Sequence, residues 1–211
     1  MGTTKVNIPK KIKVGCLDYK IKYPYVFDES NLSLRGQHCG FTSLIKLAGD
    51  SSNQIIVETL LHEIIHAVDF IFCANAFSEG FVALFSNGLF QVLRDNDLYL
   101  NTQGKIPSRV KISGFTYKVK NYKFVDSSSF WVSTLCQDSC EFRVKFYDDT
   151  DGKYSNNFIK FNLINLVCAA ICNICCDYTF PENLDLRIFS NGLFQVLYAN
   201  KLNELVRGIK C

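Results

Sequence analysis

Residues 86–93 read Ser-Asn-Gly-Leu-Phe-Gln-Val-Leu, and residues 190–197 repeat this octapeptide without a change. A phenylalanine precedes it in both places, and the run Tyr-Lys-Ile-Lys at 19–22 also has a close counterpart further along the chain. Repetition of this extent indicates a tandem duplication of a unit of about 100 residues. The sequence therefore predicts two units, 1–100 and 101–211.

Each unit is predicted to be α+β, with a small β-sheet or hairpin followed by two helices. Alternating apolar and polar residues at 12–23 indicate a hairpin that breaks near Gly15, and a second strand is predicted at 41–47. A long helix is predicted at 53–73. Ser78 is a candidate N-cap for another helix, which takes in the octapeptide.

The long helix of the first unit carries His-Glu-Ile-Ile-His at 62–66. On a helix, His62 and His66 lie one turn apart on the same face, so both imidazoles can reach one metal ion. Glu63 lies beside that face, where a carboxylate can accept a proton from an activated water. This spacing is the zinc-binding signature of metallopeptidases. It predicts Zn2+ as the cofactor, His62 and His66 as metal ligands and Glu63 as the catalytic residue.

The second unit lacks all of these chemical groups. Alignment on the octapeptides pairs each candidate residue with one that has no such chemistry: His62 with Leu166, Glu63 with Val167, His66 with Ala170 and Glu79 with Asn183. The apolar pattern around them is kept. We therefore expect the frame to fold without metal, and the polar residues of the first unit to serve function rather than packing.

Four of the ten cysteines have spacings seen in zinc sites: Cys168, Cys172, Cys175 and Cys176. The same alignment places them opposite apolar residues of the first unit's long helix. Because a free cysteine packs as a small hydrophobic side chain, core packing is the favoured interpretation. A thiolate metal site is the alternative. The N-terminus has no apolar core of a secretory signal, so reduced thiols are expected.

The composition argues against two classes of partner. The net charge of +3 comes from scattered basic residues, so nucleic-acid binding is not predicted. The longest apolar run, 163–176, is too short and too interrupted to span a bilayer, so no membrane partner is predicted. We expect an intracellular, cytoplasmic protein with a protein or peptide substrate and a second unit that packs on the first.

The motif at 62–66, Ser78-Glu79 and the octapeptide that begins at Ser86 together resemble the small phage- and prophage-encoded zincin-like metallopeptidases. These are related to the ImmA/IrrE group, whose better-known members cleave transcriptional repressors. The resemblance covers roughly residues 8–97. It implies a minimal gluzincin-like fold in which His62, His66 and an acid from the following helix hold zinc.

The third ligand departs from the family pattern, in which the acid stands about four residues before the Asn-Gly pair. This chain has Ala83 there, and Glu79 lies one turn earlier on the same helix face. Glu79 is the favoured ligand, Asp69 is its competitor, and a site with no third protein ligand is the remaining alternative.

The oxyanion formed during hydrolysis needs a stabilising group. His38, Tyr23 and Tyr25 are the visible candidates. No spacing rule selects among them, because the tyrosines also suit strand packing and His38 is expected in a loop.

The favoured function is a zinc-dependent metallopeptidase that hydrolyses peptide bonds of an intracellular protein. The main alternative is a non-catalytic binding or assembly module on a zincin-like frame, consistent with Ala83 and with a second unit stripped of its site. A third possibility is a regulator in which zinc is structural, which predicts that metal removal unfolds the first unit.

Overall fold

The computed structural model describes residues 6–28, 30, 33–96, 107–123, 133–146, 156–177, 180–182 and 184–207. It confirms the predicted α+β class, with two four-stranded sheets that are each followed in the chain by helices. The predicted unit boundary near residue 100 lies outside the described residues. Among the described helices, none is long and apolar enough to cross a membrane.

The first sheet holds four strands in the order β1 (Lys11–Val14), β2 (Leu17–Tyr25), β4 (Leu44–Ala48) and β3 (Gly36–Cys39). β1 and β2 form the predicted hairpin, with Gly15 in its turn at a φ of 57°. β2 pairs with β4 in parallel, and β3 pairs with β4 antiparallel at the edge of the sheet. In β1 every second residue is buried, as its alternating pattern predicts.

The single strand predicted at 41–47 is wrong in its limits. The 3-10 turn η2 (Gly40–Thr42) joins β3 to β4 instead. β3 escapes prediction because Gly-Gln-His-Cys shows no alternation of apolar and polar residues, and all four are only partly buried. His38 therefore lies on an edge strand and not in a loop.

Both helices of the first unit begin where the sequence predicts, and α2 does so at its predicted cap, Ser78. α1 (Asn53–Phe72) starts after Ser52, whose side chain accepts a hydrogen bond from the N–H of Ile55. α2 (Glu79–Asp95) starts after Ser78, whose side chain accepts one from Phe81. Each cap satisfies one of the backbone N–H groups that a helix start leaves without a partner.

The second unit repeats the architecture. Its sheet has the order β5 (Arg109–Ile112), β6 (Phe115–Lys123), β8 (Glu141–Phe146) and β7 (Ser133–Cys136), the same as in the first unit. Three helices follow: α3 (Asn156–Cys175), α4 (Leu186–Asn200) and α5 (Leu202–Arg207). The duplication seen in the sequence is thus a duplication of topology.

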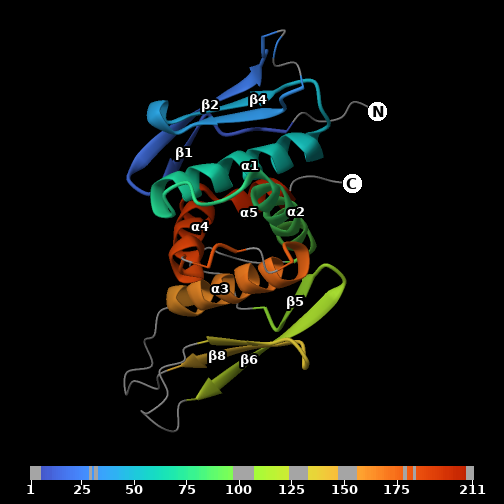
Figure 1. The fold of residues 1–211 in the computed structure, drawn as a ribbon. Helices are drawn as coiled ribbons and strands as arrows, with labels where there is room; N and C mark the ends of the chain where they lie inside the picture. Colours follow the sequence, from blue (N-terminus) through green and yellow to red (C-terminus); the bar gives the residue numbers. More distant parts are fainter. Residues whose placement is uncertain are drawn as a thin grey trace.

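The two sheets lie at opposite ends of the molecule, with the helices between them (Figure 1). α1 packs on the first sheet and α3 on the second. The second helix of each unit contacts the long helices of both units: α2 packs on α1 and α3, and α4 packs on α3 and α1. Because one hydrophobic cluster contains residues of both units, their cores are continuous.

Two asparagines tie each unit to the other in the same way. At the end of α4, the Asn200 side chain accepts from the N–H of Lys13 in β1 and donates to the carbonyl oxygen of Lys13. After α2, Asn96 makes the same pair of bonds to the backbone of Lys111 in β5. The end of each unit's second helix is thus bonded to the first strand of the other unit, in an approximately two-fold arrangement.

The repeated octapeptide lies at this junction. Gly88 of α2 meets α3, where an added Cβ would come within 2.8 Å of Ile171 Cγ2. Gly192 of α4 meets α1, where an added Cβ would come within 2.6 Å of Phe72 Cδ2. Only glycine permits these close approaches between helices. Packing between the units thus explains why the octapeptide is kept in both copies.

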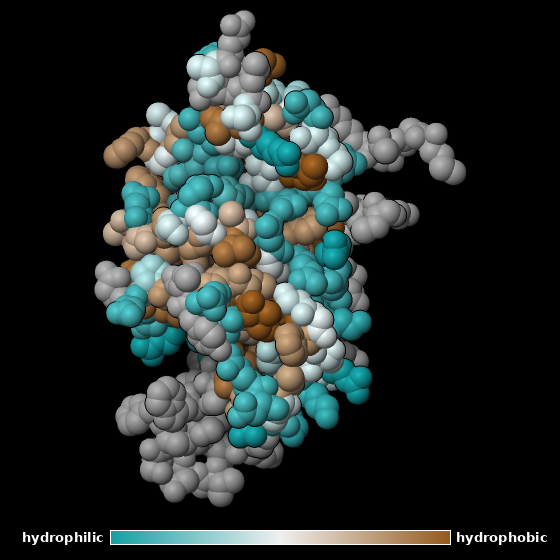
Figure 2. All heavy atoms as spheres, turned by 45° about the vertical axis from the view of Figure 1, so that its right-hand side comes forward, coloured by the Kyte–Doolittle hydropathy of each residue, from teal (hydrophilic) through white to brown (hydrophobic). Residues whose placement is uncertain are grey.

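Aromatic side chains fill the same junction. Phe85 of α2 meets Phe189 of α4 edge to face, with ring centroids 5.0 Å apart, and Phe77 meets Phe189 at the same centroid distance. In the space-filling view, apolar residues gather over the central, helical part of the visible face (Figure 2). Burial of such large rings contributes strongly to stability.

The nine cysteines within the described residues are all free thiols. Cys168, Cys172 and Cys176 of the second unit are buried. Burial raises the pKa of Cys168 and of Cys176 to about 12, which keeps both thiols protonated. Within the part of the chain that the structure describes, no cluster of possible metal ligands includes a cysteine. These facts favour the core-packing interpretation.

Candidate metal centre

His62 and His66 converge on α1 with their Nε2 atoms 3.1 Å apart. Both side chains are partly buried, at 19% and 24% exposure, so their rings are held while one edge remains open. Burial is the main influence on His62 and lowers its pKa, which favours the neutral imidazole that binds metal. The helix thus presents two ring nitrogens to one point, as the spacing predicts.

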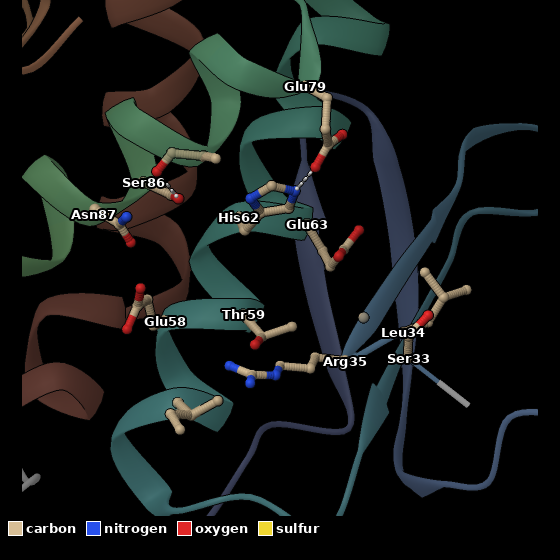
Figure 3. A pocket seen from close by; sticks show the side chains of 13 residues that line it. Ser33, Leu34, Arg35, Glu58, Thr59, His62, Glu63, Glu79, Ser86 and Asn87 are labelled. Atoms are coloured by element: carbon tan, nitrogen blue, oxygen red, sulfur yellow. Dashed lines mark hydrogen bonds and ion pairs between the residues drawn. The ribbon is translucent and has the colours of Figure 1, made fainter. Parts of the chain in front are cut away.

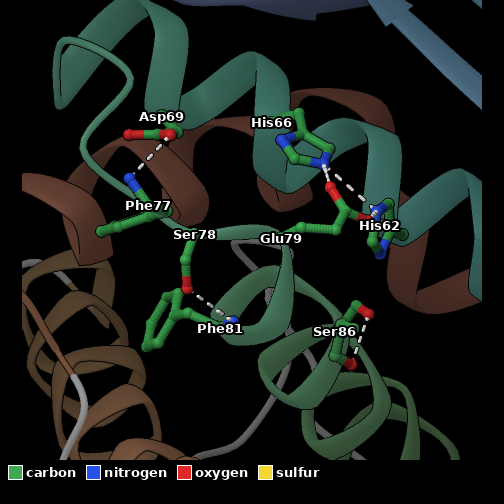
Figure 4. Close-up of polar contacts among 9 residues, drawn as sticks. His62, His66, Asp69, Phe77, Ser78, Glu79, Phe81 and Ser86 are labelled. Atoms are coloured by element: carbon green, nitrogen blue, oxygen red, sulfur yellow. Dashed lines mark hydrogen bonds and ion pairs between the residues drawn. The ribbon is translucent and has the colours of Figure 1, made fainter.

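Glu79 completes the cluster from the first turn of α2. Its Oε1 lies 2.9 Å from His62 Nε2, and its Oε2 lies 3.1 Å from His66 Nε2 (Figure 4). Ser78 is the N-cap of α2 and directly precedes Glu79, so it fixes Glu79 as the first residue of the helix. Among the described residues, these three form the one group with the proximity that a metal ion requires.

The donor set fits zinc. Two imidazole nitrogens and a carboxylate are ligands that zinc takes in catalytic sites. Around a tetrahedral zinc with bonds of about 2.0–2.1 Å, neighbouring ligand atoms lie about 3.3 Å apart. The two Nε2 atoms lie 3.1 Å apart, close to that value, and each lies 2.9 or 3.1 Å from a different oxygen of the Glu79 carboxylate. His62, His66 and Glu79 would hold the ion.

Asp69, the competing ligand, is directed away from this cluster. Its carboxylate accepts hydrogen bonds from the N–H groups of Ala76 (2.9 Å) and Phe77 (3.1 Å) (Figure 4). It therefore fixes the loop between α1 and α2. That loop in turn brings Glu79 back over the histidines, so Asp69 shapes the site without entering it.

Glu63 is buried beside the cluster, with 5% of its surface exposed. Burial, followed by the neighbouring Glu79 carboxylate, raises its pKa to about 8, and the backbone N–H of His38 acts in the opposite direction. Gly36 makes room for it, since a Cβ at Gly36 would lie 2.4 Å from Glu63 Oε1. A cation at the histidines would offset the cost of the buried charge.

The third histidine of the chain also lies at the site, and its position on β3 was not foreseen. The His38 ring is stacked near that of His66 with centroids 6.3 Å apart, and its Nε2 lies 3.2 Å from the Tyr19 hydroxyl. Burial, followed by the effect of His66, lowers the pKa of His38 to about 4. Tyr19 was missed in the sequence because it also reads as an ordinary buried strand residue.

The two tyrosines suggested by the sequence make contacts elsewhere in the first unit. Tyr25 packs edge to face on Phe27, and Lys46 lies over its ring. Tyr23 is partly buried and packs against the hydrophobic core. His38, the other candidate oxyanion stabiliser, has its ring stacked near that of His66 in the cluster.

A cavity of about 370 Å³ opens along α1 next to the cluster (Figure 3). Its walls come from α1, α2 and the segment that leads into β3. Arg35 and Glu58 stand at one end, and Glu63 and Glu79 at the other. Ala83, at the position where the family would carry its acid, is part of the wall. Two of the three donor residues, His62 and Glu79, form part of the cavity wall.

Strand register extends the comparison with the second unit. His38 pairs with Ile45 in the first sheet, and Leu135 pairs with Phe142 at the same place in the second. The ring of Tyr19 stacks on His38, whereas its counterpart Tyr117 stacks on Phe142. Leu135 therefore takes the place of His38 in the second unit.

No protein-family model, curated protein or solved structure matches the chain. The resemblance to the ImmA/IrrE group therefore stays a prediction that rests on the motifs. What the site can do is argued below from its own geometry.

Proposed function

We propose that the first unit is a zinc-dependent peptidase that hydrolyses peptide bonds of an intracellular protein. One observation carries the proposal: His62 Nε2, His66 Nε2 and the Glu79 carboxylate converge within 3.1 Å of one another, beside a buried carboxylate and an open cavity. Two histidines and an acid with a neighbouring glutamate are the parts that metal-assisted hydrolysis needs.

Zinc, when bound there, would polarise a peptide carbonyl and make a water molecule more acidic. Glu63 supplies the proton transfer. Its carboxylate can take a proton from a water in the cavity and pass it to the departing amine nitrogen. The low exposure of Glu63 keeps bulk water from competing for that proton.

β3 offers a place for the substrate backbone. It is the edge strand of the first sheet and pairs with β4 on one side only. An extended peptide can add to such an edge through main-chain hydrogen bonds. A peptide held along β3 would cross the cluster, because Gly36 approaches Glu63 and the His38 ring lies near that of His66. His38 is then the candidate donor to the developing oxyanion.

The competing function is a non-catalytic binding module, and one observation favours it. The second unit forms the same sheet and helices with Leu166, Val167 and Ala170 in place of the motif. The fold therefore does not depend on the motif residues, which is what a non-catalytic role of the first unit requires. Zinc in a purely structural role is distinguished from both by the stability of the metal-free protein.

The test uses the full chain, purified and loaded with zinc. We expect close to one zinc per chain, peptide-bond hydrolysis of an unfolded protein substrate, and loss of hydrolysis in Glu63→Gln with zinc retained. Protein with intact His62 and His66 that takes up no zinc would overturn the proposal. Zinc uptake combined with unfolding on metal removal would favour the structural role.

A further inference from the structure

Phe41 is almost fully exposed, at 97% of its surface. It lies in η2, the turn that follows β3, and its ring packs edge to face on Phe70 of α1 with centroids 5.7 Å apart. Phe70 in turn contacts the His38 ring at 5.9 Å. An aromatic pair, made of the exposed Phe41 and the partly buried Phe70, thus lies beside the candidate metal centre.

Phe70 and Phe41 follow the metal cluster along α1 and along the segment formed by β3 and η2. His62, His66 and Phe70 follow one another at intervals of four residues, so they share one face of α1. Opposite them, β3 and η2 run in the same direction: Gly36 faces Glu63, the His38 ring lies near His66, and Gly40 faces Phe70. A peptide laid along β3 past the histidines would next reach Phe70 and Phe41.

Gly40 permits this arrangement. A Cβ at Gly40 would lie 2.8 Å from Phe70 Cδ2, closer than packed atoms allow. Glycine therefore lets the turn lie against the Phe70 ring and brings Phe41 over it.

The second unit shows that the fold does not require these residues. Its turn, 137–140, has the same length and backbone as 40–43: Cys140 and Ser43 both have a φ of 47°, and both donate to the first carbonyl of the turn. At the place of Phe41 this turn carries the exposed Asp138. The equivalent of Gly40 is Gln137. An aromatic ring at position 41 is therefore not needed to form the turn.

We infer that Phe41 and Phe70 form a subsite for an apolar side chain of the peptide substrate, on one side of the bond that is cut. The inference rests on the proposed function, since it places the substrate along β3. A ring that is 97% exposed gains most from covering by a partner, and an aromatic or large aliphatic side chain is the matching group.

The test measures binding, so it does not depend on turnover. The probes are short peptide hydroxamates, which attach to zinc, with phenylalanine or glycine next to the hydroxamate. One series extends to the amino side and another to the carboxyl side. In one series, we expect the zinc-loaded full chain to bind the phenylalanine probe at least about tenfold more tightly than the glycine probe.

The matched variants are Phe41→Ala and Phe41→Asp, the latter taking the residue of the second unit. Both should reduce the preference to about twofold or less while zinc content and affinity for the glycine probe stay unchanged. Phe115→Ala removes another exposed phenylalanine, far along the chain in β6, and should keep the full preference.

The possible outcomes distinguish a failure of the proposed subsite from a failure of the proposed peptidase function. Zinc uptake and hydroxamate binding with no preference in either series, or a preference that survives in both Phe41 variants, would overturn the subsite and leave the peptidase proposal standing. A wild-type chain that takes up no zinc would overturn both.

Discussion

The long helices α1 and α3 have the same length, 20 residues, and the same place on their sheets, yet opposite character on the face toward the edge strand. α1 presents His62, Glu63 and His66 there, whereas α3 presents apolar residues. A buried carboxylate such as Glu63 costs stability unless it is compensated. α3 has apolar residues at the three motif positions, although it buries the charged Lys160 elsewhere. The comparison teaches that packing is satisfied without the motif residues.

The largest expected effect is on catalysis. Replacement of Glu63 by glutamine, or by valine as in the second unit, should lower kcat/KM by about 10²- to 10⁴-fold, because the proton-transfer group is lost. Hydrolysis of a quenched fluorescent peptide measures this, with zinc content determined on the same sample. Activity of the glutamine variant within threefold of wild type would show that Glu63 is not the base.

Next comes the metal affinity. The double variant His62→Leu/His66→Ala copies the second unit and should weaken zinc binding by at least about 100-fold, since one carboxylate remains. The free energy of unfolding of its metal-free form should lie within about 1 kcal/mol of that of the metal-free wild type, because α3 packs with leucine and alanine at these two positions. Zinc competition and chemical denaturation measure the two quantities. Strong destabilisation of the metal-free variant would contradict the lesson drawn from α3.

The junction between the units should respond symmetrically. Gly88→Ala and Gly192→Ala each place a methyl group into the opposite long helix and should each cost about 1–3 kcal/mol. Gly80→Ala is the matched control: an added Cβ there meets nothing closer than 4.0 Å, so it should be neutral or slightly stabilising. Equal behaviour of all three in urea denaturation would refute the close approach at the junction.

The asparagine ties should matter somewhat less, and unequally. Asn96 is buried, so Asn96→Ala leaves backbone groups of β5 without partners and should cost about 1–3 kcal/mol. Asn200 makes the same bonds near the surface, so its loss should cost about 1 kcal/mol. Thermal or urea unfolding measures both. A larger loss at Asn200 would mean that burial does not govern these ties.

The last effect is absent at neutral pH and appears only in alkali. The pKa of Cys168 is raised to about 12 in the folded protein from an ordinary value of 9.0, so the neutral thiol is favoured by folding. Its contribution to stability is complete below pH 9 and is lost as the pH rises from about 9 to about 12, by about 1.4 kcal/mol per pH unit. Unfolding free energies between pH 8 and 10.5 should fall less steeply in Cys168→Ala. The same pH dependence in Cys168→Ala and in wild type would indicate that the Cys168 thiol is exposed to water in the folded protein.

Local signals in the sequence were enough for much of the fold. The hairpin turn at Gly15, the cap at Ser78 and both helices of the first unit follow from residues that lie within a few positions of each other. β3 was missed because its backbone pairing with β4 is non-local and its side chains show no period. With β3, the position of His38 at the site was missed as well.

The sequence by itself determined the duplication, the α+β class and the one helix that carries the motif, because each is written in local pattern or in direct repetition. The tertiary structure decided which groups meet. It brought Glu79 to the histidines and bonded Asp69 to the loop that follows α1. It also placed His38 next to His66 and Phe41 next to Phe70, along the same face of α1. It also revealed that the octapeptide joins the two units. Contacts between distant segments depend on how whole elements pack, and no local pattern encodes that.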